Sequence, residues 1–246
     1  MKILLLIIIG LILIVIGIIL YIVFKVKSTL GDYNYGLILD AFKNAAELKK
    51  EEYSKVRQVS GMTGLCLERI RKDFPDFNEH MLFNKLEGDL RSILDAKSRR
   101  DLADLDSDTL RLVRGNVKKE IDDLIENDNK VTYSDIVFNN HAIKSYEKRN
   151  GTSTITMTSS VNYYFDSTDK HIEKYKDVKK GTLYITKYIY VYDEDKFDKN
   201  VTSFIVRCPN CGAPLKMSGE GNCEYCSSYV KPINVKTWLM SSYKED

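Results

Sequence analysis

The sequence has almost no excess charge and lacks the common catalytic strings. Its 37 Lys and Arg residues nearly cancel its 35 Asp and Glu residues, which leaves a formal net charge of +2. General attraction of the whole chain to nucleic acid is therefore not supported. The chain contains no phosphate-binding loop, no nucleophile elbow and no His-Glu-x-x-His string, so the usual sequence signatures of nucleotide, serine and zinc hydrolases are missing.

Histidine is scarce as well, with three residues in the whole chain. His80 falls in the first turn of a predicted helix and His171 in a polar hairpin, so both are expected at the surface. His141 lies in a predicted strand, where it could share a face with Asp135 and act as a general base in a pocket. A small-molecule enzyme is therefore kept as the alternative to a non-catalytic protein.

Cysteine is sparse too, with five residues in 246. Four of them form two Cys-x-x-Cys pairs, Cys208 with Cys211 and Cys223 with Cys226. Each such turn can direct two sulfurs at one ion, and two turns complete a tetrahedral shell with no position for water. The spacing predicts a structural zinc ribbon, with Zn²⁺ held by all four cysteines and a hairpin turning at residues 218–222. Two disulfides are the alternative, although disulfides are typical of small cysteine-rich domains in oxidising compartments.

The remaining cysteine and the residues that follow the pairs add detail. Cys66 stands alone and is expected to be a buried free thiol. Gly212 follows the first pair, at a position that often needs a positive φ. Ser227 occupies the equivalent position after the second pair, where a serine predicts some backbone strain.

Charge is absent from residues 3–24, which are almost entirely apolar. A helix of this length would span roughly 33 Å, close to the hydrocarbon core of about 30 Å. No small-x-small cleavage site follows, so residues 1–27 are expected to form an uncleaved, single-pass transmembrane anchor. Lys25 and Lys27 carry slightly more positive charge than the other end with Lys2, and the more positive flank prefers the cytoplasm. Thiolate ligands also persist best in a reducing compartment. The expected location is the cell membrane, with the C-terminal body in the cytoplasm.

The rest of the chain changes from helical to strand periodicity near residue 130. Helices are predicted at residues 32–59, 79–97, 101–105 and 108–126. Asn78 and Ser107 are the expected N-caps of the second and the last of these. Alternating apolar and polar residues then predict strands at residues 131–146, 152–166, 181–193 and 201–207.

Helices followed by strands indicate an α+β domain, with the helices packed on one face of a curved antiparallel sheet. In the third predicted strand, tyrosines at 184, 188, 190 and 192 share one face. Such a row covers a sheet well, and ligand binding is the alternative. Trp238 and Leu239 predict a last strand or short helix that docks on the body, because tryptophan is too apolar for a free tail.

The order of these features resembles a known family. The chain resembles bacterial members of the Tim-forty-four-like domain family in five features taken in order. These are a membrane helix, the string Asp76-Phe77-Asn78 opening a helical pair, a four-strand sheet, the string Cys-Pro-Asn-Cys-Gly-Ala-Pro-Leu from Cys208, and an ending near Trp238. That family is named for the membrane-associated scaffold of the mitochondrial protein-import motor. The resemblance covers roughly residues 74–207, and the ribbon and tail extend it to about residue 240.

The resemblance implies a nuclear-transport-factor-two-like fold, a cone of curved antiparallel sheet closed by helices. It also implies a membrane-side adaptor that contacts a protein partner or lipid head groups, without catalysis. No individual binding residue can be transferred, because no motif position is available for one. The expected layout is an anchor at 1–27, a helical linker at 28–73, the Tim-forty-four-like domain at 74–207, the zinc ribbon at 208–230 and a C-terminal docking segment at 231–246.

Nucleic-acid binding through the ribbon is a third hypothesis, because zinc ribbons often bind nucleic acid. The basic residues around the ribbon are Arg207, Lys216, Lys231 and Lys236. They are too sparse to follow a phosphate backbone, so the sequence disfavours this function.

Overall fold

The structure, a computed structural model, describes residues 2–105, 107–149, 151–168, 177–192, 208, 210, 211, 213, 221–230 and 236–246. The chain forms two compact units, Met1–Glu52 and Tyr53–Asp246. The predicted strand at 201–207 and His171 lie outside the described residues, as do Gly212 and most of the predicted turn at 218–222.

The first unit consists of helix α1, Lys2–Ser54, which continues into the second unit by its last two residues. Among the described residues, no helix combines the length and the apolarity needed to cross a bilayer. This finding overturns the predicted transmembrane anchor at 1–27, the membrane helix in the expected fold class and the single-pass membrane location.

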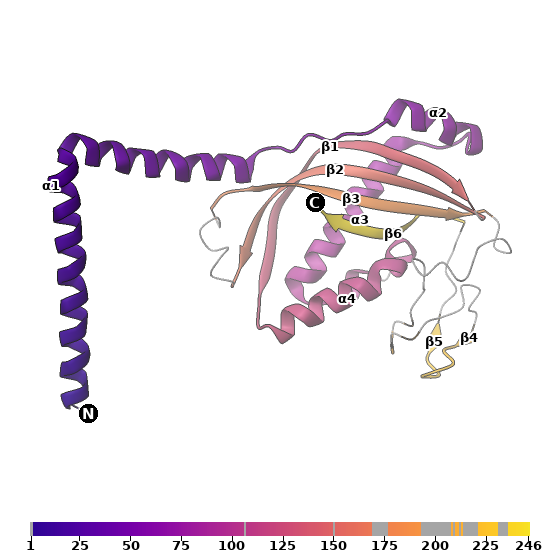
Figure 1. Ribbon diagram of the computed structural model, residues 1–246. Coiled ribbons are helices and arrows are strands. Elements are labelled where there is room, and N and C mark those ends of the chain that lie inside the picture. Colours follow the sequence, from indigo (N-terminus) through magenta and orange to yellow (C-terminus); the bar gives the residue numbers. More distant parts are fainter. Residues whose placement is uncertain are drawn as a thin grey trace. The chain divides into compact units, whose positions relative to one another are not determined.

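The second unit is an α+β domain built on a four-stranded antiparallel sheet (Figure 1). The α+β class was predicted, but the fourth strand is β6 rather than the predicted strand at 201–207, which lies outside the described residues. The strand order is β1-β2-β3-β6, so the last strand of the chain pairs with β3 at one edge. The strands are β1 Val131–Arg149, β2 Thr152–Ser167, β3 Lys180–Val191 and β6 Leu239–Glu245. The sequence predicted the first three strands closely and left the last open between strand and helix.

Helix α3 begins at its predicted capping residue, whereas α4 begins three residues later than predicted and α2 was not predicted. Asn78 caps α3 by accepting a hydrogen bond from the backbone N–H of Met81 at 3.2 Å. Ser107 makes no such cap; instead a 3-10 turn, η2, intervenes before α4. The bounds are α2 Thr63–Asp73, α3 Glu79–Arg99, η1 Ala103–Leu105, η2 Asp108–Leu110 and α4 Arg111–Glu126.

Helices α3 and α4 lie on one face of the curved sheet, and the core sits between them and the strands (Figure 1). Two tyrosines of the predicted row point into this core: Tyr184 and Tyr188 are 2% and 0% exposed, whereas Tyr192, just past β3, is 44% exposed. Trp238 docks on the body as predicted, with its ring 5.3 Å from Phe74, 6.0 Å from Phe77 and 5.6 Å from Tyr190. The C-terminal segment is therefore part of the domain.

The predicted helix at 32–59 stops at Ser54, and the chain then crosses the sheet on the face away from α3 and α4. The Asn162 side chain on β2 donates to the Ser54 carbonyl at 3.1 Å. Farther along, Met62 N–H donates to the Ile143 carbonyl on β1 at 2.9 Å. Gly181 on β3 permits the crossing, because a Cβ there would collide with the Lys55 carbonyl. These bonds to the sheet replace the last turn of the expected helix.

A buried carboxylate joins α3, β3 and η2. Asp89 is 7% exposed, and it accepts hydrogen bonds from the Tyr188 hydroxyl at 2.6 Å and the Thr109 hydroxyl at 3.0 Å. Burial raises the pKa of Asp89, and the two hydrogen bonds offset only part of that rise. Below its pKa the carboxyl group is protonated and loses its desolvation penalty.

Asp89 makes stability fall with rising pH. Its folded pKa lies above the unfolded value of about 3.9, so the folded state holds more protons in the window between the two values. The stabilisation is complete below the unfolded pKa and is lost as the pH rises through the folded pKa. The side chain in Asp89→Asn stays neutral. When the pH is raised from 4 to 8, the free energy of unfolding is therefore expected to fall less in this variant than in the wild type. Urea unfolding followed by the fluorescence of Trp238, the single tryptophan, measures this.

The control is Asp122→Asn, because Asp122 is solvent-exposed and pairs with Lys118 at 2.8 Å on the surface of α4. The other titrating groups are common to all three proteins and cancel in the comparison. A pH dependence in Asp89→Asn equal to that of the wild type would show that this carboxyl group does not contribute.

Candidate metal centre

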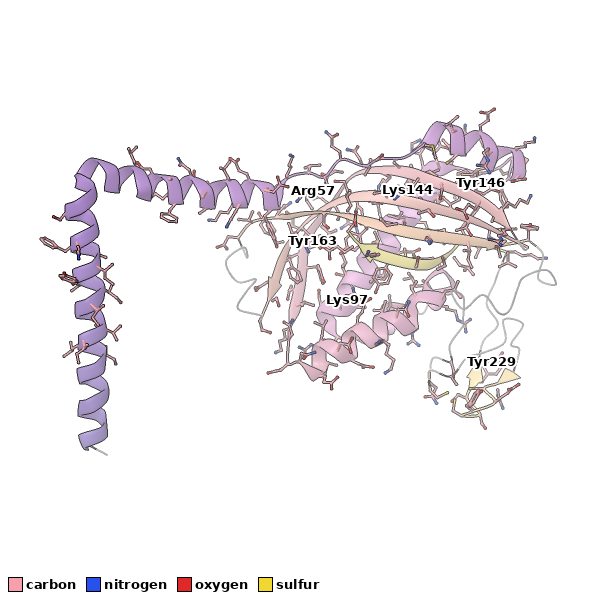
Figure 2. The ribbon with its side chains drawn as sticks, viewed as in Figure 1. Arg57, Lys97, Lys144, Tyr146, Tyr163 and Tyr229 are labelled. Carbon is pink, nitrogen blue, oxygen red and sulfur yellow. The ribbon has the colours of Figure 1, made fainter. Side chains whose placement is uncertain are left out.

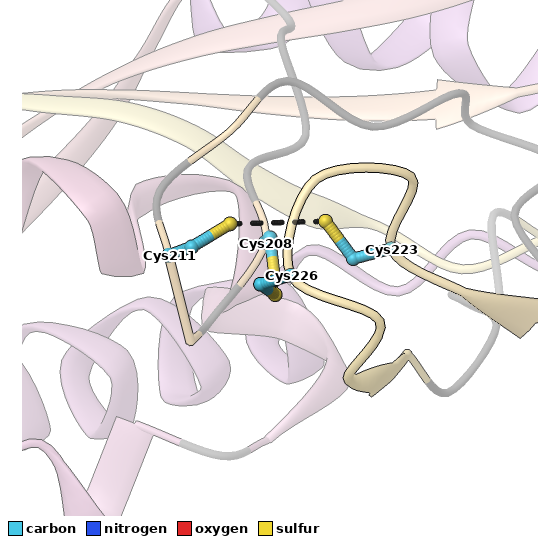
Figure 3. A group of neighbouring side chains, drawn as sticks. All are labelled: Cys208, Cys211, Cys223 and Cys226. Atoms are coloured by element: carbon cyan, nitrogen blue, oxygen red, sulfur yellow. Dashed lines mark hydrogen bonds between the residues drawn. The ribbon is translucent and has the colours of Figure 1, made fainter.

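The four predicted ligands come together in one cluster (Figure 3). Their sulfur atoms all lie within 4.8 Å of one another. The Cys208 and Cys226 sulfurs are 3.6 Å apart, and the Cys211 and Cys223 sulfurs are 3.7 Å apart. All five cysteines are free thiols, and a disulfide would need sulfurs about 2.05 Å apart. The alternative of two disulfides therefore does not describe this site.

Local hydrogen bonds shape the two turns that carry the ligands. Cys208 N–H donates to the Ala213 carbonyl at 2.8 Å in the first turn, and Cys223 N–H donates to the Ser228 carbonyl at 2.8 Å in the second. The short strands β4, Gly221–Asn222, and β5, Tyr229–Val230, pair on either side of the second turn. The described hairpin therefore encloses Cys223 and Cys226, whereas the prediction placed a hairpin between the two pairs.

Side chains also join one turn to the other. The Asn210 amide of the first turn donates to the Ser228 hydroxyl of the second at 2.8 Å. Hydrogen bonds from Ser228, and then from Asn210, lower the pKa of the Cys226 thiol to about 5. In Cys211 a backbone hydrogen bond at Ala213 is outweighed by desolvation and the three other thiols, which raise the pKa to about 12, so Cys226 ionises before Cys211. A thiol with a lowered pKa is a ready thiolate, the form that binds metal.

The spacing of the sulfurs fits a single tetrahedral ion. Four thiolates at about 2.3 Å from a central zinc lie about 3.8 Å from one another, close to the two measured separations. Cys208 and Cys223 are each 2% exposed and form a small core of their own, separate from the core of the α+β domain. The four cysteines are thus compatible with a metal site whose ligand shell is closed.

Ser227 carries the expected backbone strain. Its φ is 57°, in the left-handed region where a side chain costs about 1–2 kcal/mol. The serine keeps this conformation because Ser227 N–H donates to the Cys223 carbonyl at 2.8 Å, which closes the turn around the ligands.

The second predicted site, His141 with Asp135, does not form. The Asp135 carboxylate pairs with Lys179. His141 instead bonds to Glu87 of α3, with 2.9 Å between Nε2 and Oε1, and to Ser159 of β2, with 2.9 Å between Nδ1 and Oγ. Glu87 gave no signal in the sequence, because its contact with His141 depends on how α3 packs against the sheet.

The serine, histidine and carboxylate chain resembles catalytic triads in composition only. Ser159 is fully buried, and the His141 ring stacks on Phe83 with centroids 5.0 Å apart. Ser159, which would be the nucleophile of such a triad, has no surface exposed to a substrate. The arrangement ties α3 to β1 and β2.

The remaining predicted residues take unremarkable positions. His80 is exposed, as expected, and Cys66 is a buried free thiol, 4% exposed. Of the basic residues around the ribbon, Lys236 is described and exposed, while Arg207, Lys216 and Lys231 lie outside the described residues.

Comparisons with other proteins identify no family for this chain. Protein-family models, curated proteins and solved structures gave no match to this chain. The resemblance to Tim-forty-four-like domains, with the adaptor role it implies, stays a prediction.

Proposed function

We propose that this protein is a non-catalytic binding module, in which structural zinc orders a ribbon that contacts a protein partner. The observation that carries the proposal is the closed cluster of four cysteine sulfurs. When bound, zinc would supply folding free energy to the ribbon and leave no open coordination position for chemistry.

The donor set favours zinc over the hard cations. Thiolates select zinc or iron, whereas magnesium and calcium take oxygen ligands. Sulfur separations of 3.6 Å and 3.7 Å suit one central ion. A multi-iron cluster would hold its cysteines farther apart, because inorganic sulfide and several irons lie between them.

Two exposed tyrosines supply a contact surface on the ribbon. Tyr225 lies between the last two ligands and is 70% exposed. Tyr229 on β5, which Figure 2 labels, is 71% exposed. Tyrosine is enriched at protein interfaces, because its ring contributes apolar area while its hydroxyl finds a polar partner. The near-zero net charge favours a protein over a nucleic acid.

The test is affinity capture with the double variant Tyr225→Ala/Tyr229→Ala. The variant is expected to keep its metal and its folded body, because neither side chain is a ligand or part of the core. Its affinity for the protein that the wild type captures is expected to be about tenfold lower or more, because a tyrosine at an interface hot spot contributes about 2 kcal/mol or more.

The matched control is Tyr164→Ala/Tyr192→Ala, which removes two tyrosines that are 37% and 44% exposed on the sheet. Capture by this control should equal capture by the wild type. Equal capture by all three proteins would contradict the proposal, and so would turnover of a small molecule by the purified chain.

A further inference from the structure

A second concave site lies in the α+β domain, away from the cysteines. It is a cavity of about 710 Å³ between the C-terminal halves of α3 and α4 and the adjacent ends of β1 and β2. This volume falls within the range of small-molecule sites, roughly 300–1,000 Å³. Figure 2 labels Lys97 on α3 and Tyr163 on β2, which flank this region.

The wall of the cavity is acidic. Among the described residues it includes Glu120, Asp123 and Asp128, against one basic residue, Lys97. The Lys97 ammonium already pairs with the Glu120 carboxylate. Of these four described groups, the two that keep an unpaired charge at the rim are the exposed carboxylates Asp123 and Asp128, which favour a cation.

The inner wall is aromatic. The rings of Tyr133 and Phe165 line the cavity, with centroids 5.0 Å apart and planes tilted by 42°. Burial, and then the carboxylates of Glu245 and Glu120, raise the pKa of Tyr133, so its phenol stays neutral. Neutral aromatic faces attract cations within about 6 Å of the ring centroid.

The domain already holds two of its own ammonium groups in this way. Lys180 Nζ lies 5.5 Å from the centroid of Phe165 and pairs with Glu245. Lys97 Nζ lies 5.0 Å from the centroid of Tyr243 and pairs with Glu120. Each lysine joins an aromatic ring to a carboxylate, and groups of the same two kinds line the cavity.

We propose that this cavity binds an organic ammonium ligand. The cation lies against Tyr133 and Phe165, with Asp123 and Asp128 as its counter-charges. Leu124 and Val131, which also line the cavity, contact the alkyl part of the ligand. The site shares no residue with the metal centre and goes beyond the proposed function.

The test is isothermal titration calorimetry on the 246-residue chain with two probes, choline and spermidine, at constant ionic strength. Saturable binding of at least one probe is expected. Phe165→Leu keeps an apolar side chain but removes the aromatic face, and should weaken binding about tenfold, which lies between an exposed and a desolvated cation–π contact. Asp123→Asn/Asp128→Asn should weaken spermidine about fivefold, with the loss largest at low salt.

Asp122→Asn is the matched control, because this neighbouring carboxylate does not line the cavity. It should bind as the wild type does, and Trp238 fluorescence checks that every variant is folded. Cys223→Ser should bind both probes as the wild type does, because the cavity shares no residue with the metal centre. This result would show that the two proposals stand or fall independently. Absence of saturable binding by both probes would overturn the inference. Equal binding of acetate, or an equal loss in Asp122→Asn, would overturn it as well.

Discussion

Replacing Cys223 by serine is expected to remove the bound metal and to unfold the ribbon while the α+β domain stays folded. A serine hydroxyl is a poor substitute for a thiolate, and metal binding supplies the folding free energy of such small sites, about 10–16 kcal/mol in zinc-finger peptides. Metal affinity should fall by about a thousandfold or more, equivalent to roughly 4 kcal/mol. Metal analysis of the reduced protein measures the loss, and cobalt substitution reports the tetrahedral thiolate site by its colour.

The domain is expected to survive, because its core is separate from the small cysteine core. The ribbon lies between β3 and β6 in the sequence, so unfolding it only lengthens the loop that connects two paired strands. Loop-closure entropy grows slowly with length, by about 0.6 kcal/mol per doubling. Cys66→Ser is the control, because Cys66 is a thiol of the domain core. Full metal content in Cys223→Ser, or metal loss in Cys66→Ser, would contradict the assignment.

Trp238→Ala is the substitution expected to destabilise the domain most. The indole packs against Phe74 and Phe77, between α2 and α3, and against Tyr190 on β3. Its removal should cost about 2–4 kcal/mol, somewhat below the values for fully buried tryptophans, because the ring is partly exposed. Urea unfolding followed by circular dichroism measures this, since the variant has no other tryptophan.

Trp238→Phe keeps an aromatic ring and should recover more than half of the loss. A cost below about 1 kcal/mol in Trp238→Ala would mean that the C-terminal segment is not anchored by its ring, because isolated surface substitutions usually stay within 0.5 kcal/mol.

Local patterns predicted most of the α+β domain. The cap at Asn78 acts within three residues, and strict alternation in β2 sets which side chains face the helices. The cysteine spacing predicted the cluster of four sulfurs for the same reason, because each Cys-x-x-Cys turn is a local unit. The predicted membrane anchor rested on hydropathy alone, and the described part of α1 does not support it.

Contacts between distant segments could not be predicted from the sequence. Glu87 meets His141 across 54 positions, and the Asp89 carboxyl group meets Tyr188 across 99. Neither pair has a spacing that marks it, since each depends on how a helix docks on the sheet. The cavity beside Tyr133 and Phe165 is of the same kind, because α3, α4, β1 and β2 each supply part of its wall.

The position of β6 constrains the order in which the domain can be completed during synthesis. Strand β3 ends at Val191 and its partner begins at Leu239, so one edge of the sheet stays unpaired until the ribbon has emerged from the ribosome. An unpaired edge invites pairing with other chains. Early capture of zinc by the cysteines would compact the intervening chain and shorten the time for which that edge is open.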